Sequence, residues 1–420
     1  MKSALFRRIA PVLAAGAVVS GIGAATPADA QELRIGFLAP RTGIFTQIGN
    51  DMVNGFQMYL DEHGGKLGGA KVILVVEDTQ GKPDTAVTKA KKVILNDKSD
   101  IMVGGLLAST AYALAPVSTA EKTLYIGSSA TADDLVQRQI AKYPYVVLST
   151  WVPSLPHHPL GQWACDQGYK KIATIGADYA FGHEVVGGFQ SAFEKCGGQV
   201  IQKLWPRLGE KDFGPIIPLI KSDADAVFSL MVGPMALQFP KQLRAAGFKK
   251  PIIGGGTSYD EFVLPFMGDE VIGDVSALQY SAALPTPRNE KFVKAYRAKY
   301  GKVPSYYSEG NYSTAQLIDE ALKKHNGKYP GPEAFIKTMT SIELDAVRGK
   351  VKLDPETRSP IQDIHIKKVE KKKMFGYEKD ELWNTVIKTY PKVSQFWTFD
   401  KAEFLKQPVY SREFPPCKHC

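Results

Sequence analysis

The chain has 420 residues, of which 44% are hydrophobic and 23% are charged, and these ordinary globular proportions exclude an intrinsically disordered protein. Its formal net charge of +9 is a mild basic excess, and the dispersal of the basic residues along the chain argues against a nucleic-acid-binding function. The length predicts two or three domains.

The N-terminal segment has the pattern of a removable export signal. Three basic residues precede an apolar, small-residue stretch at 9–22, and Ala28-Asp29-Ala30 supplies an A-x-A cleavage site. The apolar stretch is too short for a comfortable membrane span, and no later apolar run approaches the ~18 residues that a transmembrane helix needs. We therefore expect a signal peptide at residues 1–30, cleaved after Ala30, and a free exported product.

Short apolar runs alternate with amphipathic segments in the first part of the mature chain. The predicted strands are 33–38, 72–77, 101–104, 123–127 and 145–148. The predicted helices are 50–62, 85–96, 110–120 and 133–140. Strands that are apolar on both faces and separated by helices predict β-α-β units and a parallel sheet.

The same alternation repeats after a cluster of prolines at positions 153, 156 and 159. The predicted strands are 171–175, 200–204, 226–231 and 251–254, and the predicted helices are 159–167, 183–195, 213–221 and 235–246. The repetition predicts an α/β protein with two doubly wound domains of similar size.

The C-terminal part departs from this pattern. Helices are predicted at 289–300, 313–323 and 332–339, followed by a hairpin after Val347. The lysines between 367 and 373 are interpreted as a solvated hairpin tip, with partner docking as the alternative. Residues 376–420 are rich in aromatic residues and proline, so we expect an irregular C-terminal extension wrapped on the surface.

The chain has four cysteines, all of them after the predicted signal peptide. In an exported protein, disulfides are the default state of cysteines. Cys165 and Cys196 lie near the ends of two successive predicted helices and could pair, whereas Cys417 and Cys420 form a C-x-x-C at the C-terminus. Four cysteines allow three pairings, and the sequence does not choose between them. A zinc or redox role would need a second ligand pair or a strand-helix setting, which this tail lacks.

Ligands of open α/β sheets bind beyond the carboxyl ends of the strands. Those positions are loops made mostly of small and hydroxylated residues, namely 40–43, 78–79, 105–110, 128–131, 177–182, 232–235 and 256–260. Phe45, Phe181 and Tyr259 are interspersed among them. The pattern predicts a ligand held by backbone amides and hydroxyls between aromatic walls.

Enzyme signatures are absent from the sequence. It contains no phosphate-binding loop, nucleophile elbow, zinc-binding H-E-x-x-H helix or dinucleotide fingerprint. Adjacent histidines such as His157-His158 rarely face one metal ion, and Asp78 is typical of a residue that fixes a loop through backbone N–H groups. We therefore expect no catalytic residue, no metal and no cofactor.

The order and spacing of several short motifs resemble a known family. They are Ile35-Gly36-Phe37-Leu38-Ala39-Pro40, Val75-Val76-Glu77-Asp78-Thr79-Gln80, Ser128-Ser129-Ala130-Thr131, Asp178-Tyr179-Ala180-Phe181-Gly182 and Gln242-Leu243-Arg244-Ala245-Ala246-Gly247. The likeness covers about residues 33–350. It is to the branched-chain amino acid binding proteins, which are type I periplasmic solute-binding proteins of ABC importers.

This resemblance implies two doubly wound parallel-sheet lobes joined by a three-crossover hinge that closes on a ligand. Lobe 1 would comprise residues 31–150 and 281–346, and lobe 2 would comprise 151–280 and 347–375. It also implies a monomer in the periplasm, without enzymatic activity, that serves an inner-membrane ABC permease with a cytoplasmic ATPase.

The family's binding roles fall on particular residues of this chain. The carboxylate-holding positions correspond to Ser109, Ser129 and Thr131, the covering aromatic residue of the opening loop corresponds to Ile48, and the lobe 2 tyrosine corresponds to Phe181. Together with the strand-end loops, these matches give a predicted ligand-contact set that consists of Ile48, Ala108, Ser109, Ser129, Thr131, Phe181, Val232 and Tyr259.

One departure from the family bears on the ligand. The acid that pairs with an amino acid's ammonium group falls near Gly256 or Thr257, and the nearest acid is Asp260. A buried ammonium group without a carboxylate partner is destabilised by several kcal/mol. We therefore favour a hydrophobic or aromatic acid as ligand, with an amino acid as the alternative.

Two other functions stay open at the level of the sequence. A periplasmic ligand-sensing receptor for a histidine kinase or chemoreceptor would share the fold and differ only in partner. A secreted α/β enzyme is the third hypothesis. A transcriptional regulator is excluded, because the chain starts with an export signal rather than a helix-turn-helix.

Overall fold

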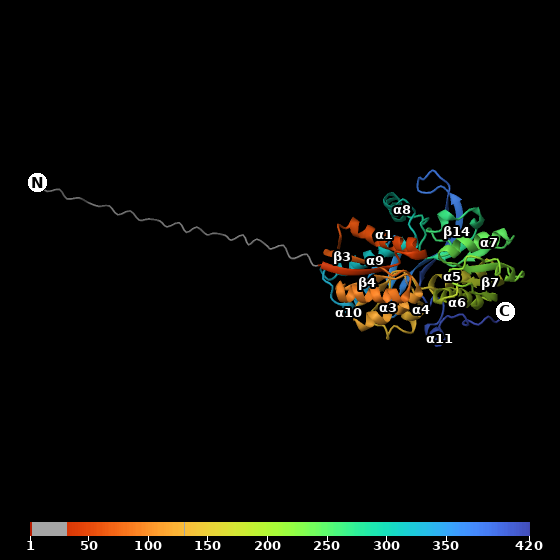
Figure 1. Ribbon diagram of the computed structural model, residues 1–420, viewed down its shortest axis with the longest axis horizontal. Coiled ribbons are helices and arrows are strands. Elements are labelled where there is room, and N and C mark those ends of the chain that lie inside the picture. The colour runs from red at the N-terminus through yellow and green to blue at the C-terminus, as the bar shows by residue number, and fades with distance from the viewer. Residues whose placement is uncertain (2–31, 130) are drawn as a thin grey trace. The chain divides into compact units, whose positions relative to one another are not determined.

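The computed structural model describes Met1, residues 32–129 and residues 131–420, so the predicted signal peptide, apart from Met1, lies outside the described residues. Two β-sheets organise the chain from Glu32 onward (Figure 1). We call the six-stranded sheet with its helices lobe 1, and the nine-stranded sheet with its helices lobe 2. Within the described residues, no helix combines the length and the apolar character needed to cross a bilayer.

The sheet of lobe 1 has the strand order β2-β3-β1-β4-β5-β6. All its pairings are parallel except the short β2–β3 hairpin. The central strands are buried on both faces, which explains their continuous apolar sequences. The bounds are β1 (Glu32–Ala39), β2 (Lys66–Leu67), β3 (Ala70–Asp78), β4 (Ile101–Gly104), β5 (Leu124–Gly127) and β6 (Val146–Leu148).

Helices cover both faces of this sheet, and Figure 1 shows α1 and α3 on opposite sides of it. The bounds are α1 (Thr46–Glu62), α2 (Pro83–Lys91), α3 (Ala108–Ala120), α4 (Asp133–Gln137), α8 (Pro287–Tyr300), α9 (Tyr306–Lys323) and α10 (Pro332–Ser341). Helices α1 and α9 approach closely at Gly55, where a Cβ atom would lie 1.9 Å from the Ser308 carbonyl oxygen. This close packing fixes the N-terminal end of α9.

The sheet of lobe 2 has the order β12-β13-β14-β11-β10-β9-β7-β8, with β15 paired to β14. Strands β7 to β11 are parallel, and β12 to β15 extend the sheet through antiparallel pairs. The bounds are β7 (Lys171–Gly176), β8 (Gln199–Leu204), β9 (Ala226–Leu230), β10 (Ile252–Gly254), β11 (Val275–Leu278), β12 (Glu343–Ala346), β13 (Gly349–Leu353), β14 (Pro360–Lys372) and β15 (Glu381–Val393).

The helices of lobe 2 are α5 (Ser154–Asp166), α6 (Ala180–Lys195) and α7 (Pro234–Ala245), and α11 (Lys401–Lys406) follows the sheet. Short 3₁₀ turns lie at Gly43–Phe45, Ile217–Leu219, Leu264–Phe266 and Asp269–Val271, and a π turn at Lys92–Asn96. A disulfide between Cys165 and Cys196 joins the ends of α5 and α6. Cys417 pairs with Cys420, so the structure selects one of the three pairings that the sequence left open.

The chain passes between the lobes three times: from β6 to α5, from β11 to α8, and from α10 to β12. Close to the third crossing, in the β12–β13 turn, Arg348 forms a buried ion pair with Glu309 of α9, at 2.9 Å. The guanidinium also donates to the Ser149 carbonyl, and the Gln362 amide donates to the Thr150 carbonyl. The first and third crossings are therefore tied together by one hydrogen-bonded network.

Two sequence expectations about secondary structure are wrong. The predicted helix at 213–221 is a set of turns around one 3₁₀ turn, because Gly214, Pro215 and Pro218 disfavour a regular helix. The lobe 2 sheet resumes at Glu343 rather than at residue 347, since β12 pairs with β13.

The C-terminal region is more ordered than an irregular extension. Residues 381–393 form β15, and the extension beyond it bridges both lobes: Arg138 of lobe 1 donates to the Gln407 carbonyl at 2.8 Å, and Lys203 of lobe 2 donates to the Pro415 carbonyl at 2.9 Å. The interpretation of the lysines between 367 and 373 as a solvated hairpin tip is wrong for Lys367. Its side chain is fully buried and donates to the Tyr280 carbonyl.

Candidate functional site

A small cavity of about 30 Å³ lies where strand-end loops of both lobes meet. Its walls are mainly aromatic and come from six positions: Phe45, Trp151, Tyr179, Phe181, Tyr306 and Tyr307. Aliphatic side chains complete the lining, namely Ile48, Leu106, Leu107 and Val232, with Ala108 beside them. Residues from lobe 1, the first crossing and lobe 2 therefore contribute to one site.

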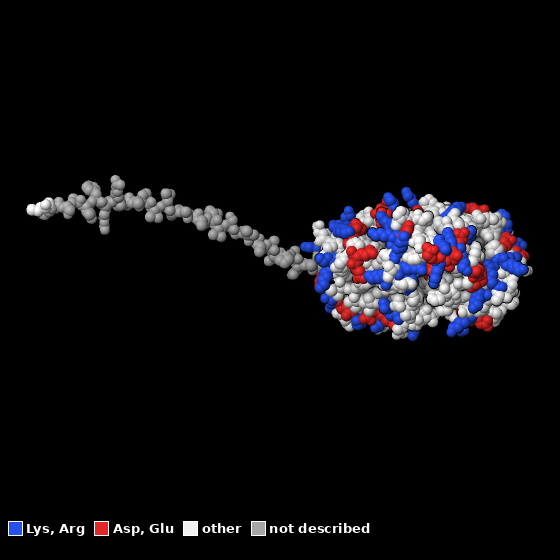
Figure 2. Space-filling model, turned by 90° about the horizontal axis from the view of Figure 1, so that it is seen from above, with Lys and Arg blue, Asp and Glu red and all other residues white. Residues whose placement is uncertain are grey.

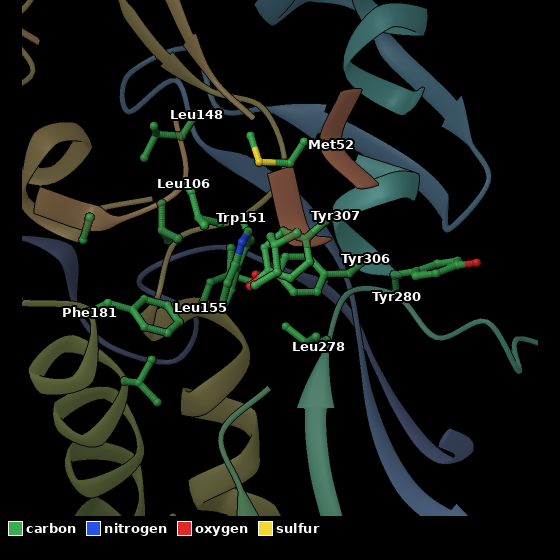
Figure 3. Packing of buried hydrophobic residues seen from close by; sticks show 14 of the residues in the cluster. Met52, Leu106, Leu148, Trp151, Leu155, Phe181, Leu278, Tyr280, Tyr306 and Tyr307 are labelled. Carbon is green, nitrogen blue, oxygen red and sulfur yellow. The ribbon is translucent and has the colours of Figure 1, made fainter. Parts of the chain in front are cut away.

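Trp151 stands at the centre of this aromatic wall, as Figure 3 shows. Its ring packs edge-on against Phe181 of lobe 2 at 5.6 Å and against Tyr306 of lobe 1 at 5.5 Å between centroids. Tyr306 in turn lies against Tyr307, at 3.9 Å. Because Trp151 belongs to the segment that links β6 to α5, movement of the lobes would change these contacts directly.

The polar lining consists of hydroxyl groups. Ser129 and Thr131 follow β5 and are buried, and the Ser129 hydroxyl accepts a hydrogen bond from the Asn311 amide at 3.1 Å. The Asn311 amide oxygen accepts from Ser128 at 2.6 Å. This network orients Ser129 and leaves its hydroxyl proton available to a ligand.

Three helices begin at the cavity: α3 at Ala108, α6 at Ala180 and α9 at Tyr306. Among the described residues, no side chain caps α3 or α6, so the N–H groups of their first two residues are open to a ligand. The helix dipoles add partial positive charge at the same place. The N-termini of α3 and α6 therefore form an environment that stabilises a ligand anion such as a carboxylate. The N-terminus of α9 contributes less, because the Tyr306 and Ser308 N–H groups already donate to Asp260 and Ser305.

Among the described residues that line the cavity, none is an acid or a base. Burial raises the pKa of Tyr179, Tyr306 and Tyr307 well above the ordinary value of a phenol, so these hydroxyls stay neutral donors. The indole Nε1 of Trp151 is buried without a hydrogen-bond partner among the described residues. It is thus a donor that a ligand oxygen could satisfy.

The cavity is too small for an organic ligand in this conformation. A volume of about 30 Å³ holds roughly one water molecule. A benzoate-sized ligand therefore needs the lobes to separate or the aromatic wall to rearrange. In this conformation the cleft is closed, and its own aromatic and aliphatic side chains fill most of it.

Six of the eight predicted contact residues line this cavity: Ile48, Ala108, Ser129, Thr131, Phe181 and Val232. Ser109 and Tyr259 are not among the described lining residues. Ser109 is partly exposed one position into α3. Tyr259 lies behind the Gly254 backbone, and its hydroxyl donates to Asp274 at 2.8 Å.

Asp260, the acid nearest to the family's ammonium-binding position, and the adjacent histidines His157 and His158 have structural partners. Asp260 accepts hydrogen bonds from the backbone N–H groups of Phe262 and Tyr306. His157 accepts from the Gly256 N–H at 3.1 Å, and His158 bonds to the Tyr410 hydroxyl at 3.2 Å. The described residues contain no cluster of three or more potential metal ligands. Likewise, Asp78 fixes its loop by accepting from the backbone N–H groups of residues 41 and 80, as expected.

Sequence reasoning missed the contribution of α9. The helix was expected to start at residue 313, whereas it starts at Tyr306 with Ser305 as N-cap, and the Ser305 hydroxyl accepts from the Ser308 N–H. This earlier start brings Tyr306, Tyr307 and Asn311 to the site. A serine directly after Pro304 is an N-cap signal that could have revealed it.

A larger groove of about 1110 Å³ lies between α1, α8 and α9 of lobe 1 and β12 of lobe 2. Its lining mixes acids and bases, such as Glu62, Arg288, Lys291 and Asp345. Charges of both signs are likewise interspersed over the face in Figure 2. This charged lining differs from the uncharged aromatic lining of the cleft cavity, and none of the predicted contact residues is among its described lining residues.

Comparison with known proteins agrees with this architecture. The family model described as "Periplasmic binding protein" matches residues 32–373. The Leu/Ile/Val-binding protein homolog 6 of Brucella melitensis is 28% identical over 377 residues, which cover 88% of this chain and 94% of the homolog. The match with the family model ends at the β14–β15 turn, before the C-terminal extension.

Two similar solved structures are ABC-transporter solute-binding proteins from Rhodopseudomonas palustris. The protein of strain BisB5, in complex with 3,4-dihydroxybenzoic acid, is 30% identical with a TM-score of 0.81, covering 87% of this chain and 98% of its own. The protein of strain HaA2, in complex with p-hydroxybenzoic acid, is 26% identical with a TM-score of 0.79, covering 87% and 99%.

Proposed function

This chain belongs to the periplasmic binding protein family, and from that membership and the geometry of the cleft we propose that it captures a small aromatic or other hydrophobic carboxylate between its two lobes. It then presents the closed, loaded form to an ABC importer. The observation that carries the proposal is the cavity itself, where uncharged aromatic walls meet the uncapped N-termini of α3 and α6.

The cavity favours a carboxylate without an amine. Backbone N–H groups and the hydroxyls of Ser129 and Thr131 offer donors to the carboxylate. An α-ammonium group would find no acid among the described lining residues, and its burial would cost several kcal/mol. The R. palustris proteins, which bind hydroxybenzoic acids, support the same ligand class.

Binding would act through the hinge. A ligand between Phe181 of lobe 2 and Tyr306 of lobe 1 touches both lobes only when they are close together. It therefore stabilises the closed form, and the population shifts toward the form that a permease recognises. Trp151 lies between these two rings, so its fluorescence should report closure.

Location and partner follow from the family and from the predicted export signal. We infer a periplasmic protein that is released after cleavage at Ala30 and docks on an inner-membrane permease. The two R. palustris proteins are solute-binding proteins of ABC transporters, which supports a permease rather than a kinase as the partner.

The test is a thermal-shift comparison of ligand pairs that differ in one group. Phenylalanine and 3-phenylpropionate differ only in the ammonium group, and benzoate and benzamide differ in the carboxylate. We expect 4-hydroxybenzoate, benzoate or 3-phenylpropionate to stabilise the protein, by about 2.7 kcal/mol at 100 times the dissociation constant. Stronger stabilisation by phenylalanine or leucine would overturn the ligand assignment, and stabilisation by benzamide equal to that by benzoate would overturn the role of the helix N-termini.

A further inference from the structure

A second cavity, of about 370 Å³, lies at the junction of the lobes. Its walls come from the α8–α9 connection of lobe 1 and, in lobe 2, from residues 261–269 and the β14–β15 turn. The volume falls in the range of small-molecule sites. No residue of this junction cavity also lines the cleft cavity.

The basic side chains of the junction cavity are already paired. Arg297 forms a two-pronged ion pair with Glu381, with both N···O distances 2.8 Å. Lys371 pairs with Asp269 at 2.8 Å, and Lys302 pairs with the buried Asp51. These pairs leave little positive charge to attract an anion.

Two acids of the same cavity form no ion pair among the described residues: Glu261 and Asp380. Glu261 is 4% exposed, and its Oε1 accepts from the Ala282 N–H at 3.0 Å and from the Asn384 amide at 3.1 Å. Its Oε2 is buried without a hydrogen-bond partner in the described part of the chain. Glu261 lines the cavity, and its unpartnered oxygen lies beneath the accessible surface. A donor that enters the cavity reaches this oxygen when the side chain turns outward, and a charged donor satisfies it best.

Helix polarity reinforces this preference. Helix α8 ends at Tyr300, and Gly301, its left-handed C-cap, lines the cavity. The carboxyl end of a helix carries partial negative charge, which favours a nearby cation. The remaining lining is largely apolar and includes Leu264, Met267 and Leu382.

We propose that the junction cavity is a second ligand site, which takes a small organic cation: a primary amine with a short apolar body. The ammonium group bonds to the Glu261 carboxylate, Asp380 adds negative charge on the exposed side, and the alkyl part packs against Leu264 and Leu382. Because both lobes contribute to the walls, the bound amine contacts both lobes and stabilises their packing at this junction. The site also adjoins the second crossing, because Glu261 accepts a hydrogen bond from the Ala282 N–H.

The proposal is tested by calorimetric titration of the full exported chain with n-butylamine, in phosphate buffer because Tris is itself an amine. Matched probes are 1-butanol, which lacks the charge, and butyrate, which reverses it. We expect one saturable site for butylamine and none for the other two. Absence of saturable butylamine binding up to about 50 mM, or equal binding of butyrate, overturns the proposal.

Variants locate the site. Glu261→Gln keeps an acceptor for the Ala282 N–H and should lower butylamine affinity about tenfold, and Asp380→Asn, an exposed change that leaves packing intact, should lower it about threefold. Glu290→Gln is the control, because Glu290 is a partly exposed acid on the same helix α8, paired with Lys294 and not among the described lining residues of the cavity. Unchanged affinity in Asp380→Asn and in folded Glu261→Gln overturns the proposal.

The two proposed ligand sites are distinguished by measuring the binding of each ligand to variants of the other site. Phe181→Ala should weaken binding of the aromatic acid at the cleft and leave butylamine binding unchanged. Failure of the acid screen with retained butylamine binding would reject only the proposed function. Butylamine binding that is lost in Phe181→Ala and retained in Glu261→Gln would place the amine in the cleft and overturn the second site.

Discussion

The two cavities at the lobe boundaries have opposite electrostatic character. Among the described residues, the cleft cavity has no charged lining residue and receives the uncapped N-termini of α3 and α6, whereas the junction cavity has two acids without an ion pair and a helix C-terminus. The cleft cavity holds about one water molecule, and the junction cavity has a volume of about 370 Å³. The two proposed sites would therefore take ligands of opposite charge, in keeping with the polarity of the helix ends at each.

The largest effect is expected from the buried ion pair that joins the two lobes. Arg348→Met leaves the Glu309 carboxylate buried without its partner, and we expect unfolding free energy to fall by about 3–5 kcal/mol. Chemical denaturation measures this loss. The double variant Arg348→Met/Glu309→Leu should recover most of the stability, and a double variant as unstable as the single one would contradict the explanation.

Reversing the electrostatic character of the cleft gives the next largest effect. Val232→Asp places a carboxylate in the lining near the uncapped helix N-termini, so affinity for an aromatic acid should fall about 100-fold, or about 2.7 kcal/mol. Val232→Ala is the matched control for lost volume. The ratio of phenylalanine to 3-phenylpropionate binding should rise in Val232→Asp, and an unchanged ratio would show that the missing acid does not decide specificity.

The unfolding free energy, measured over a series of pH values, tests how the buried His158 affects the stability of the fold. Burial lowers the pKa of His158 to about 3, from 6.5 in the unfolded chain. Below pH 6.5 the unfolded state binds a proton that the folded state does not, so this residue destabilises the fold as pH falls toward 3. At pH 5 the contribution is about 2 kcal/mol.

His158→Gln should therefore gain stability relative to the natural chain between pH 7 and pH 5, as measured by denaturation at each pH. Asp274 acts in the opposite direction, because burial raises its pKa to about 6 and its contribution is lost as pH rises from about 4 to 6. Asp274 is present in both proteins, so its contribution cancels when the unfolding free energy of the natural chain is subtracted from that of His158→Gln at each pH. A pH-independent difference would mean that His158 has the same pKa in the folded and unfolded states, which would contradict the lowered pKa.

The smallest effect concerns one hydrogen bond. Trp151→Phe keeps an aromatic ring between Phe181 and Tyr306 and removes the unpartnered Nε1 donor. Affinity for an aromatic acid should fall about tenfold, or about 1.4 kcal/mol. Titration monitored by calorimetry checks this, and unchanged affinity would mean that the indole N–H does not reach the ligand.

The sequence predicted the two-lobe α/β fold because its signals are local. Strands such as 101–104 and 226–230 are apolar on both faces, and helices alternate with them at regular intervals. The family resemblance placed Ser129, Thr131 and Phe181 at strand ends, and the structure gathers them in one cavity. Strand-end loops of a doubly wound sheet converge for topological reasons, so these positions could be found without coordinates.

Distance along the chain limited what could be predicted. Tyr306 and Tyr307 reach the cleft only because α9 starts at Ser305 and packs closely on α1 at Gly55. Strand β15 joins the lobe 2 sheet although its sequence alternates weakly and contains Pro391, since pairing with β14 outweighs local propensity.

By itself, then, the sequence determined the alternation of elements, the fold class and the strand-end positions of the cleft, because periodicity and turn residues act over a few residues. Only the tertiary structure decided the disulfide pairing, the aromatic closure around Trp151 and the unpaired state of Glu261. The Cys165–Cys196 bond requires α5 to pack against α6, Glu261 meets Asn384 of β15, and the closure around Trp151 requires the two lobes to approach. These contacts join segments that are far apart in the chain, so local sequence signals do not specify them.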